Sequence, residues 1–205
     1  KKPINKSRKF IENFFIKKGL KILVDLSKKK KPSVNEMILK EPYIPELEDL
    51  YNLYQYVLIN KRTTILEFGS GWSTLIFSLA LQELKEKFTT EIELLRRNNF
   101  FELIVIENER KYLHITKNKL LRFNKLLKIK NPTKIRYHFS DVEMTTFNNR
   151  ICTQYIKLPL CNPDFVYLDG PDQFKVKKNL NNITTKHKDM MPMVSDINKF
   201  EYFYT

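Results

Sequence analysis

Hydrophobic residues along the chain follow two patterns, one typical of buried strands and one typical of amphipathic helices. Four short apolar runs have the length of buried strands, and a polar or glycine-containing segment follows each of them. They span residues 64–68, 100–106, 134–139 and 164–170. Elsewhere, apolar residues recur at helical spacing. They predict helices over about residues 47–58, 73–87 and 109–128.

Strands that alternate with helices of this length indicate βαβ units and a parallel sheet. We therefore predict an α/β fold with a doubly wound, mainly parallel sheet and a helical N-terminal extension. The expected division is residues 1–40 for the basic extension and residues 41–205 for the sheet domain. Between the third and fourth strands the sequence predicts an irregular stretch. Residues 172–188 are expected to be partly helical, and residues 200–204 approach a fifth strand.

The positive charge of the chain is concentrated at its start. Residues 1–31 contribute +10 to the net charge of +14, through twelve Lys or Arg against Glu12 and Asp25. Apolar residues at helical spacing lie among these lysines: Phe10, Ile11, Phe14 and Phe15. One interpretation is a basic amphipathic segment on an anionic membrane surface or on nucleic acid. The other, which we favour, is a solvated helix whose apolar stripe packs on the domain.

Length and composition limit the class of protein. A chain of 205 residues with 42% hydrophobic content suits one ordinary globular domain. No apolar run approaches the roughly 18–20 residues that span a bilayer, and the start lacks the pattern of a signal peptide. Cys152 and Cys161 favour two reduced thiols in a cytoplasmic protein over a disulfide framework. We expect the chain to be a fragment, truncated at its C-terminus.

The segment of residues 64–74 has the pattern of a strand, a glycine turn and a helix start. Gly69 and Gly71 flank Ser70, and glycine permits both a tight turn and the close approach of a ligand to the backbone. N–H groups at the helix start, near Ser73 and Thr74, can meet a polar ligand. The segment therefore predicts a site for a nucleotide-like ligand.

Carboxylates follow three of the predicted strands. Ligands bind at the carboxyl ends of the strands in a doubly wound sheet. The carboxylates expected there are Glu107, Asp141, Asp169 and Asp172. Asp and Glu also favour caps and turns, which accounts for any one of them. Their occurrence after three strands, next to a glycine turn, favours a ligand site.

An acid also precedes the glycine turn. Glu67 stands two residues before Gly69, and Thr74 occupies the position of the third glycine of a dinucleotide motif. A negative charge there does not suit a pyrophosphate, and the missing glycine disfavours a nicotinamide dehydrogenase. The acid suits a ligand that carries positive charge, such as an amino group or a sulfonium.

Together these segments resemble class I S-adenosylmethionine-dependent methyltransferases. Glu67-Phe68-Gly69-Ser70-Gly71 resembles their first motif. Ile104-Val105-Ile106-Glu107 is similar to their second strand, whose terminal acid takes the two ribose hydroxyls of the cofactor. Ser140-Asp141 lies where the family contacts the adenine, and residues 164–170 resemble the strand that borders the methyl-transfer site. The resemblance covers roughly residues 45–175. The family sheet has seven strands, and only four are recognisable here.

The resemblance implies a methyltransferase that uses S-adenosylmethionine on a small-molecule or glycan-type acceptor, at an oxygen. The implied cofactor-binding residues are Glu67, Gly69, Ser70, Gly71, Ser73, Thr74, Glu107, Asp141 and Asp169. Asp169 is also a candidate general base or ligand of a divalent metal ion, and Asp172 could assist in either role. The alternatives for Asp169 are a cap or a cofactor contact, and no other feature supports a metal.

Two other functions remain open from the sequence. The chain could be an RNA methyltransferase that docks through its basic N-terminal segment. It could also be a non-catalytic Rossmann-like binding module that acts at a membrane or in an assembly. His114, His138 and His187 are poor catalytic candidates, since none lies in a recognisable catalytic pattern. The cysteines and histidines lack zinc-ligand spacing, and no nucleophile elbow is present.

Overall fold

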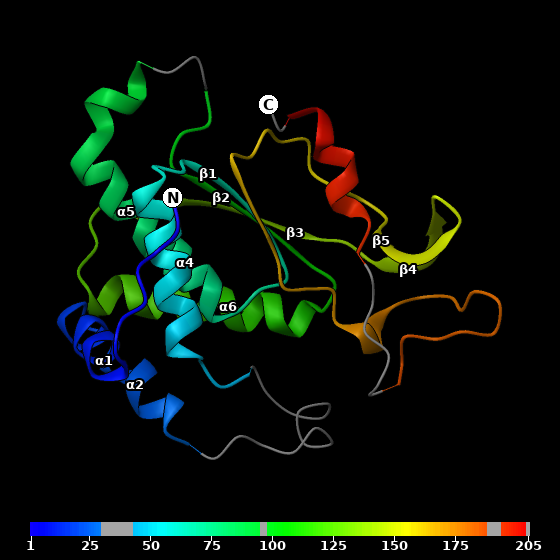
Figure 1. Cartoon of the computed structure of the whole chain (residues 1–205), viewed down its shortest axis with the longest axis horizontal. Coiled ribbons are helices and arrows are strands. Elements are labelled where there is room, and N and C mark those ends of the chain that lie inside the picture. Colours follow the sequence, from blue (N-terminus) through cyan, green and yellow to red (C-terminus); the bar gives the residue numbers. More distant parts are fainter. Residues whose placement is uncertain (30–42, 95–97, 188–193, 204–205) are drawn as a thin grey trace.

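The computed structural model describes residues 1–29, 43–94, 98–187 and 194–203, with side chains up to residue 200 (Figure 1). Its elements, in chain order, are α1 (Arg8–Lys17), α2 (Lys21–Ser27), α4 (Leu47–Ile59), β1 (Thr64–Phe68), α5 (Trp72–Glu93), β2 (Glu102–Glu107), α6 (Arg110–Leu126), β3 (Lys134–Phe139), β4 (Val142–Phe147), β5 (Arg150–Tyr155), β6 (Phe165–Leu168), η1 (Gln173–Lys175) and η2 (Asp196–Phe203).

The four predicted strands form one parallel sheet in the order β3-β2-β1-β6. In its register, Glu67 lies opposite Val105 of β2 and Tyr167 of β6. The α/β class and the parallel sheet are therefore confirmed. Because all four strands run the same way, the segments that follow them meet at one edge of the sheet, with β1 between β2 and β6. We call this edge the carboxyl edge and the opposite one the amino edge.

Helices cover one face of the sheet. Side chains that alternate along the strands, such as Ile65 and Val105, pack in one cluster with Leu75 and Ala80 of α5 and Leu120 of α6. Figure 1 shows α4, α5 and α6 together on this side. The helix expected to end near residue 87 continues to Glu93. Non-helical backbone at Phe88 marks a kink close to the expected end.

The opposite face is covered by the antiparallel β4–β5 hairpin and by η2. The expectation of an irregular stretch here is wrong. Asn148 and Asn149 both have positive φ, 48° and 60°, between the paired residues Phe147 and Arg150. A type I′ hairpin turn requires positive φ at both central residues, and Asn tolerates it well. The chain thus returns from β3 to β6 across this face through a hairpin rather than an α-helix.

Two further expectations near the C-terminus need correction. Residues 200–203 belong to the 3₁₀ helix η2 and form no fifth strand. Phe200 packs on Phe68, with ring centroids 6.4 Å apart, so its apolar character serves the hairpin-side core. In the described part of 172–188, only Gln173–Lys175 is helical.

The basic N-terminal segment folds onto the domain. Ile11 and Phe15 are buried in the same cluster as the sheet and α5. Phe14 contacts Tyr51 and Tyr54 of α4 edge-on, at 5.1 and 5.2 Å between ring centroids. This agrees with the interpretation that the apolar stripe packs on the domain while the lysines stay solvated. No helix in the described ranges is both long and apolar enough to cross a membrane.

Candidate functional site

Two glycine turns touch at the carboxyl edge. Gly69 has φ of 97°, and a Cβ on it would lie 2.9 Å from the carbonyl oxygen of Asp169. A Cβ on Gly170 would lie 2.9 Å from the nitrogen of Gly69. Backbone hydrogen bonds of 2.8 Å, from Asp169 N to Phe68 O and from Gly69 N to Ile106 O, fix the turns against the strands. Only glycine fits at both positions, because each turn occupies the space of the other's side chain.

The start of α5 is more open. Apart from Gly71 and its two chain neighbours, no described atom lies within 4 Å of the Cβ position of Gly71, so this part of the turn leaves room for a ligand. The two hydroxyl side chains that follow are used inside the turn. Thr74 Oγ1 accepts from Gly71 N at 3.0 Å, and Ser73 Oγ donates to Glu67 Oε1 at 2.5 Å. Ser73 and Thr74 therefore position the turn and Glu67.

Glu67 is the most deeply buried acid of the edge, with 0% of the residue exposed. Ser73 satisfies its Oε1. The Thr74 hydroxyl lies close enough to lower the pKa of the group, but Oε2 accepts no hydrogen bond of good geometry from the described residues. Burial raises the pKa of this carboxyl to about 8, against the hydroxyl bonds that lower it, and the charges of Asp169 and Glu107 raise it further. Leaving a buried polar atom unsatisfied costs about 1–3 kcal/mol. Such an oxygen at a strand end can accept a hydrogen bond from a ligand or pair with a positive charge on it.

Glu107, at the end of β2, is held in one orientation by neutral donors. Its Oε2 accepts from Ser70 Oγ at 2.7 Å, and its Oε1 accepts from the backbone N–H groups of Asn108 and Glu109 at 2.8 and 2.9 Å. Burial raises its pKa to about 7, and these hydrogen bonds oppose that shift. The second strand therefore presents an oriented carboxylate directly beside the glycine turn, as the sequence predicts.

The two acids after β6 differ in their surroundings. Asp169 as a whole residue is exposed beside the turn, yet burial of its carboxyl group and then the charge of Asp49 raise its pKa to about 6. Asp172 caps η1, because its Oδ1 accepts from Phe174 N at 2.9 Å. The pKa of Asp172 is raised, mainly by burial. Asp172 therefore has the capping role that an acid in a turn commonly takes, and Asp169 is left available for a ligand.

Asn108, which the sequence argument missed, ties two loops of the site together. Its Oδ1 accepts from Asp172 N at 2.8 Å, and its Nδ2 donates to Asp172 O at 3.0 Å. Since β1 lies between β2 and β6, this reciprocal pair crosses the carboxyl end of β1. The only sequence signal was a polar residue directly after a strand, which is too common to single it out.

Aromatic side chains add to the same edge. The charges of Asp172 and Asp169 act on Tyr43, and those of Asp172 and Glu107 act on Tyr112, so burial and charge raise the pKa of both phenols. Trp72 Nε1 donates to the carbonyl oxygen of Tyr43 at 3.2 Å and so anchors that residue beside the helix start. Neither tyrosine follows a strand, so strand-end reasoning could not find them.

Asp141 is not brought into the group. Its carboxylate forms an ion pair with Lys177 at 2.7 Å. The charged groups that shift the pKa values of Glu67, Glu107 and Asp169 are one another, Asp172 and Asp49, and Asp141 is not among them. Its neighbour Ser140 contacts β2 through a 3.1 Å hydrogen bond from Ser140 N to Glu107 O.

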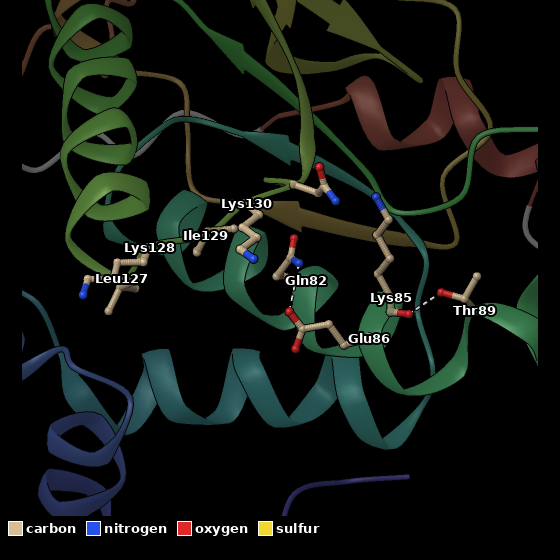
Figure 2. A pocket seen from close by; sticks show the side chains of 9 residues that line it. Gln82, Lys85, Glu86, Thr89, Leu127, Lys128, Ile129 and Lys130 are labelled. Carbon is tan, nitrogen blue, oxygen red and sulfur yellow. Dashed lines mark hydrogen bonds between the residues drawn. The ribbon is translucent and has the colours of Figure 1, made fainter.

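Within the described part of the chain no metal centre lies at this edge, and the pocket that the structure shows lies elsewhere. The described residues contain no group of three or more His, Cys, Asp or Glu placed to hold a metal ion, so Asp169 lacks companion ligands there. A pocket of about 590 Å³ lies elsewhere, between α5 and the end of α6 at the amino edge (Figure 2). It is lined by Gln82, Lys85, Glu86, Thr89, Leu127, Lys128, Ile129, Lys130 and Asn131. No predicted site residue lines it.

Comparisons of the chain with protein-family models, with curated proteins and with solved structures gave no match. Functional inference therefore rests on the geometry of the carboxyl edge. This edge combines a glycine turn with open space at Gly71, an oriented carboxylate at Glu107 and an unsatisfied buried carboxylate oxygen at Glu67. Such an edge can accept hydrogen bonds from hydroxyl groups and can balance a positive charge.

Proposed function

We propose that this chain binds S-adenosylmethionine at the carboxyl edge and transfers its methyl group to an oxygen of a small-molecule or glycan-type acceptor. The observation that carries the proposal is the unsatisfied Oε2 of Glu67, fully buried beside the glycine turn. A buried carboxyl group whose second oxygen lacks a partner either keeps a proton or pairs with a cation, and a cationic ligand beside Glu67 would favour its ionised form. S-adenosylmethionine carries both an ammonium and a sulfonium group.

The residues of the edge fit the parts of this cofactor. Glu107 would accept hydrogen bonds from the two ribose hydroxyls, as charge-assisted bonds that replace the present bond from Ser70. Glu67 would balance the ammonium group at the amino-acid end. The open space beside Gly71 would let the ligand approach the backbone. When bound, the cofactor supplies a methyl group on a positively charged sulfur, an electrophile that needs no further activation.

Asp169 is our candidate for the proton-accepting residue. Its backbone lies against Gly69, which supports this role because we expect the methionine end of the cofactor to bind beside that glycine turn. A pKa of about 6 leaves its carboxylate ionised at neutral pH while it remains a useful base. The remaining contribution of the protein is to hold donor and acceptor in line.

Titration calorimetry with S-adenosylhomocysteine tests the proposal, and β2 offers a matched pair of variants. Glu107→Gln should weaken binding about ten- to a hundredfold, because a charge-assisted bond is worth about 1.5–3 kcal/mol. Glu102→Gln changes an equally buried acid at the other end of the same strand, and it should leave the affinity unchanged. Absence of binding by the unmodified chain, or equal losses in both variants, would contradict the proposal. Binding without methyl transfer to any acceptor would favour a non-catalytic module.

A second candidate, an RNA acceptor, is favoured by one observation. Lys9, Lys17 and Lys21 are exposed on α1 and α2 and form no ion pair within the described part of the chain. Ile11 and Phe15 of the apolar stripe beneath them are already buried, whereas Phe10 of the same stripe is 47% exposed. Reversing these three charges to Glu should weaken RNA binding and flatten its salt dependence by about one unit per lost phosphate contact. Deleting the segment would be uninformative, because Phe15 and Leu23 belong to the core.

A further inference from the structure

A buried tyrosine reaches the candidate site from the opposite face of the sheet. Tyr155 is the last residue of β5, is 1% exposed and packs its ring on Phe68 at 5.4 Å between centroids. Its backbone N–H donates to Asp196 Oδ2 at 3.0 Å, which fixes the end of the hairpin against η2. The contact with Phe68 fixes the ring, and the bond to Asp196 fixes the backbone. The hydroxyl of Tyr155 therefore has a defined position.

That position lies at the junction of the two glycine turns. Tyr155 Oη is 2.9 Å from where a Cβ on Gly170 would stand, and the same point is 2.9 Å from Gly69 N. Within the described residues the hydroxyl has no hydrogen-bond partner. It is thus a second unsatisfied buried oxygen at the carboxyl edge, on a different element from Glu67.

The surroundings define what this hydroxyl can do. The charged groups that act on it are all carboxylates: Glu107, Asp196, Asp169 and Asp172. Burial and these charges raise the pKa of the phenol well above its usual value near 10, so it keeps its proton. A protonated phenol beside carboxylates is a hydrogen-bond donor. Donors form their strongest bonds with anionic oxygens.

We propose that the Tyr155 hydroxyl donates a hydrogen bond to the carboxylate of a ligand bound at the glycine turns. This rests on the proposed function: the ligand is adenosyl-methionine-like, and its amino-acid end is a zwitterion. Glu67 serves the ammonium and repels the ligand's carboxylate. A cationic donor at this position would form an ion pair with Glu107 or Asp169. The uncharged phenol does not, and it therefore stays available to donate to the ligand's carboxylate. The hairpin that replaces an α-helix on this face thereby contributes a specificity residue.

Three probes that differ in their carboxylate and ammonium groups test the role of the Tyr155 hydroxyl. S-adenosylhomocysteine has both the ammonium and the carboxylate, its decarboxylated form keeps only the amine, and methylthioadenosine lacks both. In Tyr155→Phe, affinity for S-adenosylhomocysteine should fall about ten- to a hundredfold, the loss expected for a hydrogen bond to a charged group. Affinity for the other two probes should not change, because neither presents a carboxylate.

Tyr54→Phe is the matched control. The Tyr54 hydroxyl is also buried but donates to Glu83, so its loss should lower thermal stability and leave all three affinities unchanged. Tyr155→Phe should show the reverse, with no loss of stability, since its hydroxyl has no partner to lose among the described residues.

The outcomes separate the two proposals. An unmodified chain that binds none of the probes contradicts the proposed function itself. A chain that binds S-adenosylhomocysteine no more tightly than its decarboxylated form retains the proposed function and overturns the role of Tyr155. That role is also overturned if Tyr155→Phe weakens all probes equally, weakens none, or fails to fold, because a folding requirement would make the hydroxyl structural.

Discussion

Acidic side chains at the two edges of the sheet differ in the partners that their carboxylates have. Glu102 and Glu107 begin and end β2, and each is 3% exposed. Glu102 forms ion pairs of 3.0 Å with Lys134 and with Arg136 on β3, whereas Glu107 receives only neutral donors from the described residues. The carboxylate that precedes β6, Asp164, accepts from the backbone of Thr63 and Thr64, while Asp169, which follows β6, receives no such bonds from the described backbone.

This difference separates acids that stabilise the fold from acids that are available to bind a ligand. A carboxylate that is paired with cations, as Glu102 is, cannot take a ligand without losing those ion pairs, whereas Glu107 receives only neutral donors from the described residues, and the hydrogen bond from Ser70 can be replaced. At the amino edge, Asp164 ties β1 to β6, and Glu102 ties β2 to β3. At the carboxyl edge, Glu67 retains an oxygen without a described partner, and burial of the carboxyl group raises its pKa to about 8. Variants at matched positions can test this separation.

The largest effect is expected for Asp164→Ala. The variant removes the acceptor for Thr63 N, Thr63 Oγ1 and Thr64 N, at 2.9, 3.0 and 3.0 Å. The free energy of unfolding should fall by about 2–4 kcal/mol, measured by urea denaturation. Asp169→Ala, at the other end of the same strand, should change it by no more than about 0.5 kcal/mol. Similar losses in both would remove the distinction between the edges.

Glu67→Gln should stabilise the protein, and the effect should depend on pH. The folded pKa is raised from near 4.5 to about 8, so the folded state retains a proton that the unfolded state has lost. Stability therefore falls as the pH rises from about 4.5 to 8. The variant should be about 1–3 kcal/mol more stable than the parent at pH 8 and nearly equal to it at pH 4.5. Melting curves at both values measure this, and a destabilised variant at pH 8 would show that Glu67 is a structural acid.

Ligand binding should depend on the ionisation of Glu107. Only the carboxylate form can accept both ribose hydroxyls, and its pKa is about 7. Affinity for methylthioadenosine, which lacks an amino-acid end of its own, should therefore rise up to about tenfold per pH unit below pH 7 and level off above it. The Glu107→Gln variant should lose this dependence. A flat profile in the parent chain would argue against Glu107 as the acceptor.

The smallest effect is expected for Asn108→Ala. This change removes the two bonds that tie the loop after β2 to the loop after β6. We expect a loss of about 1 kcal/mol or less, with faster hydrogen exchange of the Asp172 amide as the sensitive measure. Unchanged exchange at Asp172 would mean that other contacts hold the loop.

The local elements of the sheet domain could be predicted from the sequence, but the elements on the face that the hairpin covers could not. The strands and helices of the sheet domain were predictable because burial repeats with the period of each element. The β4–β5 hairpin was missed although its Asn148-Asn149 turn is a recognisable signal. Val142–Phe147 alternates imperfectly, so periodicity alone did not separate it from a loop.

Some residues of the candidate site were likewise predictable from the sequence, and others were not. Glu67, Glu107 and the glycine turn were predictable because parallel strands bring their ends to one edge. Asp141 follows a strand as Glu107 does, yet Lys177 takes its carboxylate. Asn108 and Tyr155 could not be singled out from the sequence. Their roles depend on residues that the fold brings next to them, Asp172 for Asn108 and Gly170 for Tyr155.

By itself, the sequence determined the order of strands and helices, the glycine turn and the acids that flank it, since these depend on local backbone geometry and on burial. Tertiary structure alone decided which acids are satisfied. Asp164 finds its donors about a hundred residues earlier in the chain, and Glu67 finds a donor among the described residues for only one of its two oxygens. Whether a carboxylate holds the fold together or is left for a ligand depends on partners distant in sequence, which periodicity cannot show.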